Sequence, residues 1–284
     1  MGINSKEEFS SEEKVKFQAA INLIGKTVDT GNRALLKFPT EHYDLELFMF
    51  INLLERFTVH LLGINQLLKQ YANNPALEQP IGLIARAGLL DFMIITYISS
   101  YQADIGYSAD PDGSRYKQQL NKILCDQVQF TFKFAREAKN SSIISTDEYK
   151  QVVESTVHNY SFLFTDNVID DYEKPETKLV EQKTISPVQL FKRIHSHSLT
   201  IKFSMIYDLY TYYSKYEHFG IMTHFMQRQG VDVDMERIFG AVQYLIKGMG
   251  ATFRYLAGPE NILEKEINEL DKLEEDFVLL TYNS

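Results

Sequence analysis

Apolar residues recur at helical spacing along almost the whole chain. In the first such stretch Phe17, Ile21 and Ile24 follow one another at steps of four and three residues, which keeps them on one face of an α-helix. Residues 41–71 are apolar on nearly every face, as is typical of a helix buried in a core. No stretch shows the alternation of a strand. We therefore predict an all-α protein: a multi-helix bundle of about eight to ten helices, with a single core or two packed helical halves.

Turn and capping residues indicate where the predicted helices begin. The turn Asp110-Pro111-Asp112-Gly113 precedes a helix over residues 114–139. Ser145 followed by Glu148 has the spacing of a capping box, in which each side chain satisfies a backbone N–H of the first turn. This box predicts a helix that runs to about residue 164. The other helices that we expect cover about 80–102, 187–195, 199–219 and 233–256, with a terminal helix after Gly258-Pro259.

Residues 165–186 interrupt the helical pattern. The segment is acidic, contains Pro175 and has no sustained apolar period. A loop of this length is uncommon inside a compact domain. We expect it to be an acidic loop or linker between an N-terminal helical half (1–164) and a C-terminal half (187–284).

Composition excludes the disordered, collagenous and disulfide-scaffold classes. The chain has 284 residues, of which 44% are hydrophobic and 24% charged. Its 29 Lys and Arg against 38 Asp and Glu give a net charge of −9, which opposes general attraction to nucleic acid. Residues 259–277 carry eight acidic side chains and two lysines. This run is either the solvated face of a terminal helix or a docking surface for a basic partner.

The chain has no feature of an exported or membrane-spanning protein. Cys125 is the single cysteine and lies among apolar neighbours, so it is expected to be a small buried residue. The N-terminal residues are polar, unlike a secretory signal. The longest apolar run, residues 87–101, contains Asp91 and is shorter than the roughly 20 residues that a membrane helix needs. We expect a cytoplasmic protein without a transmembrane segment.

Arg86 and Asp91 are the first candidate site residues. They are the charged residues of an otherwise apolar helical stretch, 81–95. Five residues at about 100° each place them roughly 140° apart around the helix, so they do not pair with each other. Each therefore needs a partner on another helix, because an unpaired buried charge is costly. The two residues are therefore either members of structural ion pairs or parts of a polar site that binds an anion through Arg86.

A second candidate is a polar stripe near residue 210. Tyr207, Thr211, Ser214 and His218 share one face of a predicted helix. Ser214 and His218 have the i, i+4 spacing that allows a hydrogen bond, but no third group that orients the histidine is visible. The alternative is a half-buried helix whose tyrosine hydroxyls reach water.

These two stretches, 83–91 and 213–218, resemble bacterial all-helical families of unknown function that combine an Arg and acid helix with a Tyr/Ser helix ending in His. The resemblance covers roughly residues 40–260. Helical ribonuclease-like domains, which have Arg and His separated by four to six residues, are a second analogy. The pairs Arg56 with His60 and Arg193 with His197 have three intervening residues, so they lack that spacing.

Function remains open between two classes. No segment matches a strong catalytic, metal or phosphate-loop signature, and we expect no cofactor and no metal. The first expectation is a noncatalytic interaction or sensor module, with Asp91, Tyr207 and Ser214 as binding residues and a homodimer or another protein as partner. The alternative is a hydrolase of RNA or another phosphate ester, in which Arg86 neutralises the phosphate and His218 is the acid or base.

Overall fold

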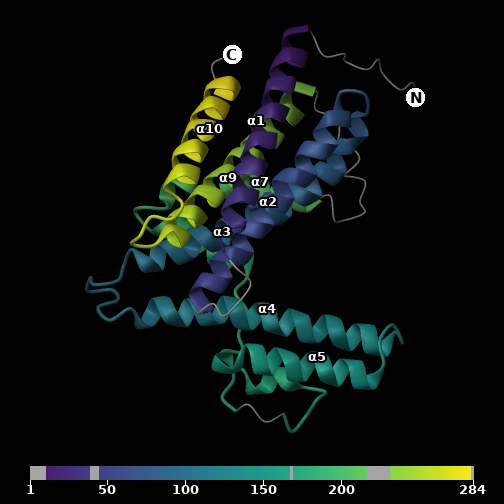
Figure 1. Cartoon of the computed structure of the whole chain (residues 1–284), viewed down its shortest axis with the longest axis vertical. Helices are drawn as coiled ribbons and strands as arrows, with labels where there is room; N and C mark the ends of the chain where they lie inside the picture. The colour runs from purple at the N-terminus through teal and green to yellow at the C-terminus, as the bar shows by residue number, and fades with distance from the viewer. Residues whose placement is uncertain (1–10, 39–44, 167–168, 216–230, 283–284) are drawn as a thin grey trace. The chain divides into compact units, whose positions relative to one another are not determined.

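The structure, a computed structural model, describes residues 11–38, 45–166, 169–215 and 231–282. Within those ranges it contains nine α-helices, and β-structure is limited to two isolated bridges. The prediction of an all-α multi-helix bundle is confirmed. The helices are α1 (Ser11–Leu35), α2 (Leu45–Tyr71), α3 (Glu78–Gln102), α4 (Ser114–Asn140), α5 (Thr146–Asn159), α6 (Pro187–Ser196), α7 (Ile206–Ser214), α9 (Val231–Ala257) and α10 (Glu264–Tyr282) (Figure 1).

Two compact units divide the chain. Unit 1 combines residues 1–96 with 194–284, and unit 2 is the single stretch 97–193. The predicted linker, 165–186, lies inside unit 2 rather than between the units. The chain passes from one unit to the other within α3 and again within α6.

The core of unit 1 is built on contacts of α1 with α2 and α10, and of α9 with α2 and α10 (Figure 1). Two of these helices approach closely at Gly248 of α9. A Cβ atom on that residue would lie 2.4 Å from Cζ of the buried Phe57 on α2, which is closer than packed atoms tolerate. Glycine at this position therefore allows the two helices to meet.

Helix α10 covers part of this core with its apolar row. Leu263, Leu270 and Phe277 are all buried, while the acidic Glu264, Asp271 and Glu275 are exposed. These three acidic side chains thus lie on the solvated face of a helix whose apolar row docks on its own chain.

Unit 2 is organised around the hairpin of α4 and α5, which contact each other (Figure 1). The predicted capping box is present: Ser145 Oγ accepts from the Glu148 backbone N–H, and Glu148 accepts from that of Ser145. Cys125 is buried on α4, as expected.

The segment 165–186 contains no α-helix in its described residues, 165–166 and 169–186, and it is tied to the rest of unit 2. It contains a short 3-10 turn at Pro175–Lys178. Leu179 is buried and pairs with Phe164 in an isolated bridge. Arg136 of α4 donates to Glu176 at 2.7 Å. Burial and hydrogen bonding of this kind make the segment part of a packed unit.

The predicted helix over 199–219 differs from the structure. A 3-10 turn at Ile201–Phe203 comes first, and α7 begins at Ile206. The hydroxyl of buried Thr200 donates to the Ile194 carbonyl at 2.9 Å and holds the chain in a turn. Leu199 and Ile201, which precede α7, are exposed, whereas Ile206, Tyr210 and Tyr213 of α7 are buried at helical spacing.

Candidate functional site

Three charged side chains of α3 each meet a different set of partners. Glu78 is in the first turn, Arg86 two turns later and Asp91 beyond it. All three lie within the part of α3 that belongs to unit 1. The polar chemistry of unit 1 is therefore distributed along one helix.

Asp91 is the centre of the first set, which we name the Asp91 cluster. Its carboxylate is 1% exposed and accepts three hydrogen bonds from α2. Arg56 donates from Nε to Oδ2 at 2.9 Å and from Nη2 to Oδ1 at 2.8 Å, while His60 Nε2 lies 2.9 Å from Oδ2. Because an ionised carboxylate only accepts, we assign the Nε2 proton to His60. The expectation that Asp91 pairs with a residue outside its own helix is met by α2.

Arg86 contacts α7. Its Nε donates to Ser214 Oγ at 3.1 Å and its Nη2 to the Tyr210 hydroxyl at 3.3 Å, with the guanidinium carbon 5.2 Å from the centre of the Tyr210 ring. The structure therefore brings together two of the predicted site residues, Arg86 and Ser214. Tyr207 packs its ring against Tyr210, with centroids 6.3 Å apart. His218 lies outside the described residues, so its distance from Arg86 is not defined.

The third set, which we name the carboxyl cluster, is formed by Glu78 of α3 with Asp234 and Arg237 of α9. Both carboxyl groups are buried, at 5% and 7% exposure, and they are close enough for Glu78 to act electrostatically on Asp234. The Asp234 Oδ1 is 3.8 Å from Arg237 Nη1, too far for a hydrogen bond, and it has no such bond among the described residues. Tyr212 of α7 donates to Glu78 Oε1 at 3.4 Å.

This environment changes the proton affinity of Asp234. Burial, as the largest cause, and the nearby Glu78 carboxyl together raise the pKa of Asp234 from 3.8 to about 7, against the opposing effect of Arg237. Burial also raises the pKa of Tyr71 and of Tyr213, and the two carboxyl groups add to that effect. Groups on α2, α3, α7 and α9 therefore share one electrostatic environment.

Sequence reasoning missed the carboxyl cluster. Glu78 has the ordinary signal of an acidic residue in a first helical turn, and Asp234 follows 156 positions later. The pair Arg56 and His60 did have a signal, because the i, i+4 spacing places both on one face of a helix. Their common partner Asp91 is on another helix, which the spacing does not reveal.

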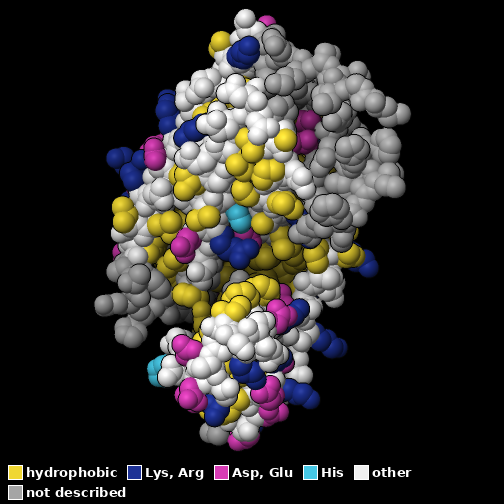
Figure 2. Space-filling model, turned by 90° about the vertical axis from the view of Figure 1, so that its right-hand side faces the viewer, with side chains coloured by type: hydrophobic (Ala, Val, Ile, Leu, Met, Phe, Trp, Pro, Cys, Tyr) yellow, Lys and Arg dark blue, Asp and Glu magenta, His cyan; other side chains and the backbone are white. Residues whose placement is uncertain are grey.

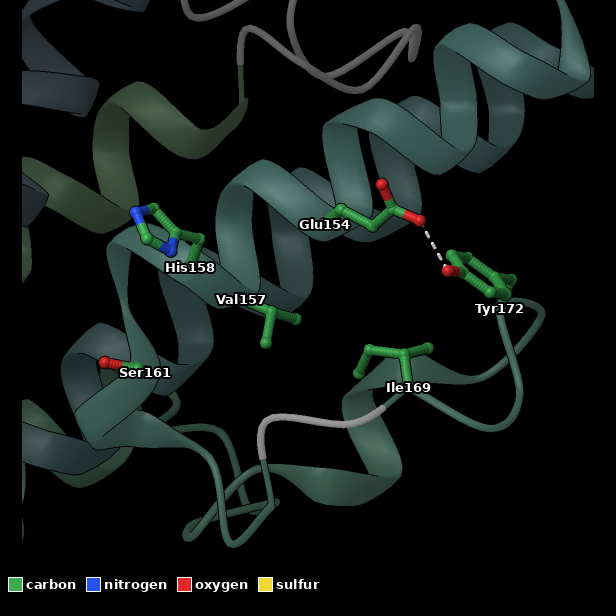
Figure 3. A pocket seen from close by; sticks show the side chains of 6 residues that line it. All are labelled: Glu154, Val157, His158, Ser161, Ile169 and Tyr172. Carbon is green, nitrogen blue, oxygen red and sulfur yellow. Dashed lines mark hydrogen bonds between the residues drawn. The ribbon is translucent and has the colours of Figure 1, made fainter.

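A surface pocket of about 340 Å³ lies in unit 2, between α5 and the segment that follows it (Figure 3). Its lining residues are Glu154, Val157, His158, Ser161, Ile169 and Tyr172. Glu154 and Tyr172 point toward each other, and the Tyr172 hydroxyl donates to Glu154 at 2.6 Å (Figure 3). This bond occupies the carboxylate, and it raises the pKa of Tyr172. The described ranges hold no group of three or more His, Cys, Asp or Glu side chains that could bind a metal ion.

Helices α2 and α3 are also the most apolar ones. Each contains a window long and apolar enough to cross a membrane, with mean hydropathy 1.5 and 1.7. In α3 the helix extends well beyond the apolar run at 87–101, and 67% of its window is buried inside the protein. A core helix of a water-soluble protein can be just as long and apolar. Length and composition alone therefore do not place α2 or α3 in a bilayer.

The chain was compared with protein-family models, with curated proteins and with solved structures. None of the three comparisons found a match. The resemblance to helical families of unknown function stays untested, and the functional argument rests on the geometry of this chain.

Proposed function

We propose that the protein is a noncatalytic cytoplasmic module that senses protons through its carboxyl cluster. The observation that carries this proposal is the burial of two neighbouring carboxyl groups, Glu78 on α3 and Asp234 on α9. Burial and a neighbouring carboxyl group both oppose ionisation, so Asp234 holds its proton to a higher pH than an exposed aspartate does. The state of that proton is thereby linked to the packing of α3 against α9.

Proton release adds a negative charge to a buried environment. Arg237 faces Asp234 at 3.8 Å, and its guanidinium also stacks 4.0 Å from the centre of the Tyr212 ring. The carboxyl group of Glu78 and the phenol groups of Tyr71 and Tyr213 are titratable groups that interact with Asp234. Burial makes the ionised form of Asp234 costly, so its formation should weaken the contacts of α7 and α9 with α3.

Replacing Asp234 by Asn tests the proposal. The folded protein holds a proton on Asp234 up to about pH 7, whereas an unfolded aspartate releases it near pH 3.8. The free energy of unfolding of the wild type should therefore fall as the pH rises from 5 to 8, by at most about 1.4 kcal/mol per pH unit. Asp234→Asn stays neutral and should flatten this slope. Asp208→Asn, at an exposed aspartate of α7, is the matched control and should keep it.

A sensor must also respond while it remains folded. We expect amide hydrogen exchange in α7 and at the start of α9, corrected for the intrinsic rate at each pH, to be faster at pH 8 than at pH 6 in the wild type. In Asp234→Asn the two corrected rates should be equal. Equal corrected rates in the wild type would contradict the proposal.

We further propose that a protein partner, or a second copy of the chain, binds the module at the surface of α4. Phe130 and Phe134 lie one turn apart on this helix and are 70% and 65% exposed. Large exposed apolar side chains grouped in this way mark contact surfaces. Light scattering should give a dimer mass for the wild type at high concentration and 32.9 kDa for Phe130→Ser. A wild type that stays at 32.9 kDa throughout contradicts the second copy as the partner.

The alternative function is a hydrolase of RNA or another phosphate ester. The observation in its favour is that Arg86 contacts Ser214, four residues before His218 in the sequence. This alternative would be favoured over the sensor if the wild type hydrolysed a generic phosphodiester and both Arg86→Met and His218→Gln lost that activity. Thr211→Val, on the same predicted stripe, is the control that should keep such activity.

A further inference from the structure

The guanidinium of Arg56 is held on one edge and open on the other. Its Nε and Nη2 donate to the two oxygens of Asp91, and the side chain is 50% exposed. An arginine has five N–H groups, so three of them remain, two on Nη1 and one on Nη2. Among the described residues Nη1 makes no hydrogen bond. This outer edge has the fork geometry that binds a carboxylate or phosphate through two parallel bonds.

Asp91 and His60 keep that edge in place. Asp91 is buried and accepts three hydrogen bonds, so its carboxylate is fixed away from solvent. His60 is one helical turn from Arg56, and its Nε2 also hydrogen-bonds Asp91. Few degrees of freedom remain to be ordered when an anion binds.

Aliphatic side chains surround this polar edge. Helices α2 and α3 run antiparallel, because Arg56 meets Asp91 and, seven residues further along α2, Gly63 faces Ile84, seven residues earlier on α3. Three exposed residues along this contact are apolar, Val59 (57%), Leu62 (41%) and Leu83 (40%), and the acidic Glu55 beside Arg56 is exposed as well. On the face drawn in Figure 2, basic, acidic and hydrophobic side chains lie close to a histidine.

We infer that Arg56, together with Val59 and Leu62, forms a binding site for an oxyanion that carries an alkyl chain. The outer edge of the guanidinium holds the carboxylate or phosphate group. The alkyl chain lies along the aliphatic side chains of α2. Asp91 positions Arg56 and does not touch the ligand. This site is separate from the carboxyl cluster and does not depend on proton sensing.

Calorimetric titration of the full chain at pH 6 and low salt tests the site, with hexanoate and hexyl phosphate as probes. Hexylamine and inorganic phosphate are the matched control ligands, one without the negative charge and one without the chain. We expect both probes to bind at least tenfold more tightly than either control. Hexylamine binding as tightly as hexanoate, or inorganic phosphate binding as tightly as hexyl phosphate, would overturn the inference. The comparison of the two probes distinguishes a carboxylate from a phosphate ligand.

Variants locate the binding. Arg56→Lys keeps the charge but loses the fork, and should weaken hexanoate binding at least tenfold. Arg33→Lys is the control, because Arg33 is a similarly exposed arginine paired with a carboxylate, Glu269, on α10; it should bind as the wild type does. Val59→Ser should reduce the advantage of hexyl phosphate over inorganic phosphate. The site is refuted if folded Arg56→Lys binds hexanoate as the wild type does, or if Arg33→Lys loses as much affinity as Arg56→Lys. If Arg56→Lys does not fold, the comparison of probe and control ligands on the wild type still tests the site.

Discussion

Replacing either member of the Arg56 and Asp91 ion pair should lower the free energy of unfolding. The loss should be larger for Arg56, the more exposed of the two. Arg56→Met leaves the Asp91 carboxylate at 1% exposure with one remaining hydrogen bond, from His60. Removing a partner from a buried charge costs about 3 to 5 kcal/mol. We expect about 4 kcal/mol for this variant, because α2 and α3 keep water away from the carboxylate.

Asp91→Leu removes the buried charge itself. Arg56 is half exposed, so its guanidinium regains hydrogen bonds to water, and leucine fills a similar volume in an apolar helix. The free energy of unfolding should then fall by about 2 kcal/mol, which is the net contribution of the hydrogen bonds that are lost. The double variant should cost less than the sum of the two single ones by at least about 1.5 kcal/mol, since the pair is in direct contact.

Urea unfolding monitored by helical circular dichroism at pH 7 measures all three free energies. The matched control is Arg33→Met with Glu269→Leu, a pair whose side chains are 44% and 38% exposed. Exposed pairs contribute about 0 to 1 kcal/mol, so both control variants should cost little. A larger loss in Asp91→Leu than in Arg56→Met, or additivity within about 0.5 kcal/mol, would show that Asp91 is not buried and paired as described.

Two further predictions concern packing and capping. Gly248→Ala should lower the free energy of unfolding by about 1 to 3 kcal/mol, because its Cβ would overlap the Phe57 ring; a neutral effect in urea unfolding would contradict the close approach of α2 and α9. Ser145→Ala should cost about 1 kcal/mol through loss of the hydrogen bond to the Glu148 N–H, and Ser145→Thr should restore most of it. Equal losses in the alanine and threonine variants would assign the effect to something other than the cap.

Local signals in the sequence were sufficient for most helices. The box of Ser145 and Glu148 fixed the start of α5, since both partners are three residues apart and their hydrogen bonds depend on local backbone geometry. The predicted start at residue 199 was wrong, because a 3-10 turn at Ile201–Phe203 comes before α7. Ile206, Tyr210 and Tyr213 are buried at helical spacing, so periodicity located the buried face of α7 but not the turn that precedes the helix.

For the site residues, the sequence predicts that partners are needed but not which residues they are. The sequence predicts that Arg86 and Asp91 need partners on other helices, and they have them. Which partners these are depends on the packing of α3 against α2 and α7, which no local spacing encodes. The pairing of Glu78 with Asp234 is the extreme case, because two carboxyl groups are expected to repel and no rule of charge complementarity would join them.

The division into units also determines the order in which the chain can fold during synthesis. Unit 2 is one uninterrupted stretch of ninety-seven residues, so all of its contacts become available once residue 193 has left the ribosome. Unit 1 is completed by α9 and α10, which contact α1 and α2 across about 190 to 240 residues. Until these helices are made, the apolar faces of α1 and α2 lack their final cover. Contacts of such long range are slow to form, and this interval is when the chain is most exposed to aggregation.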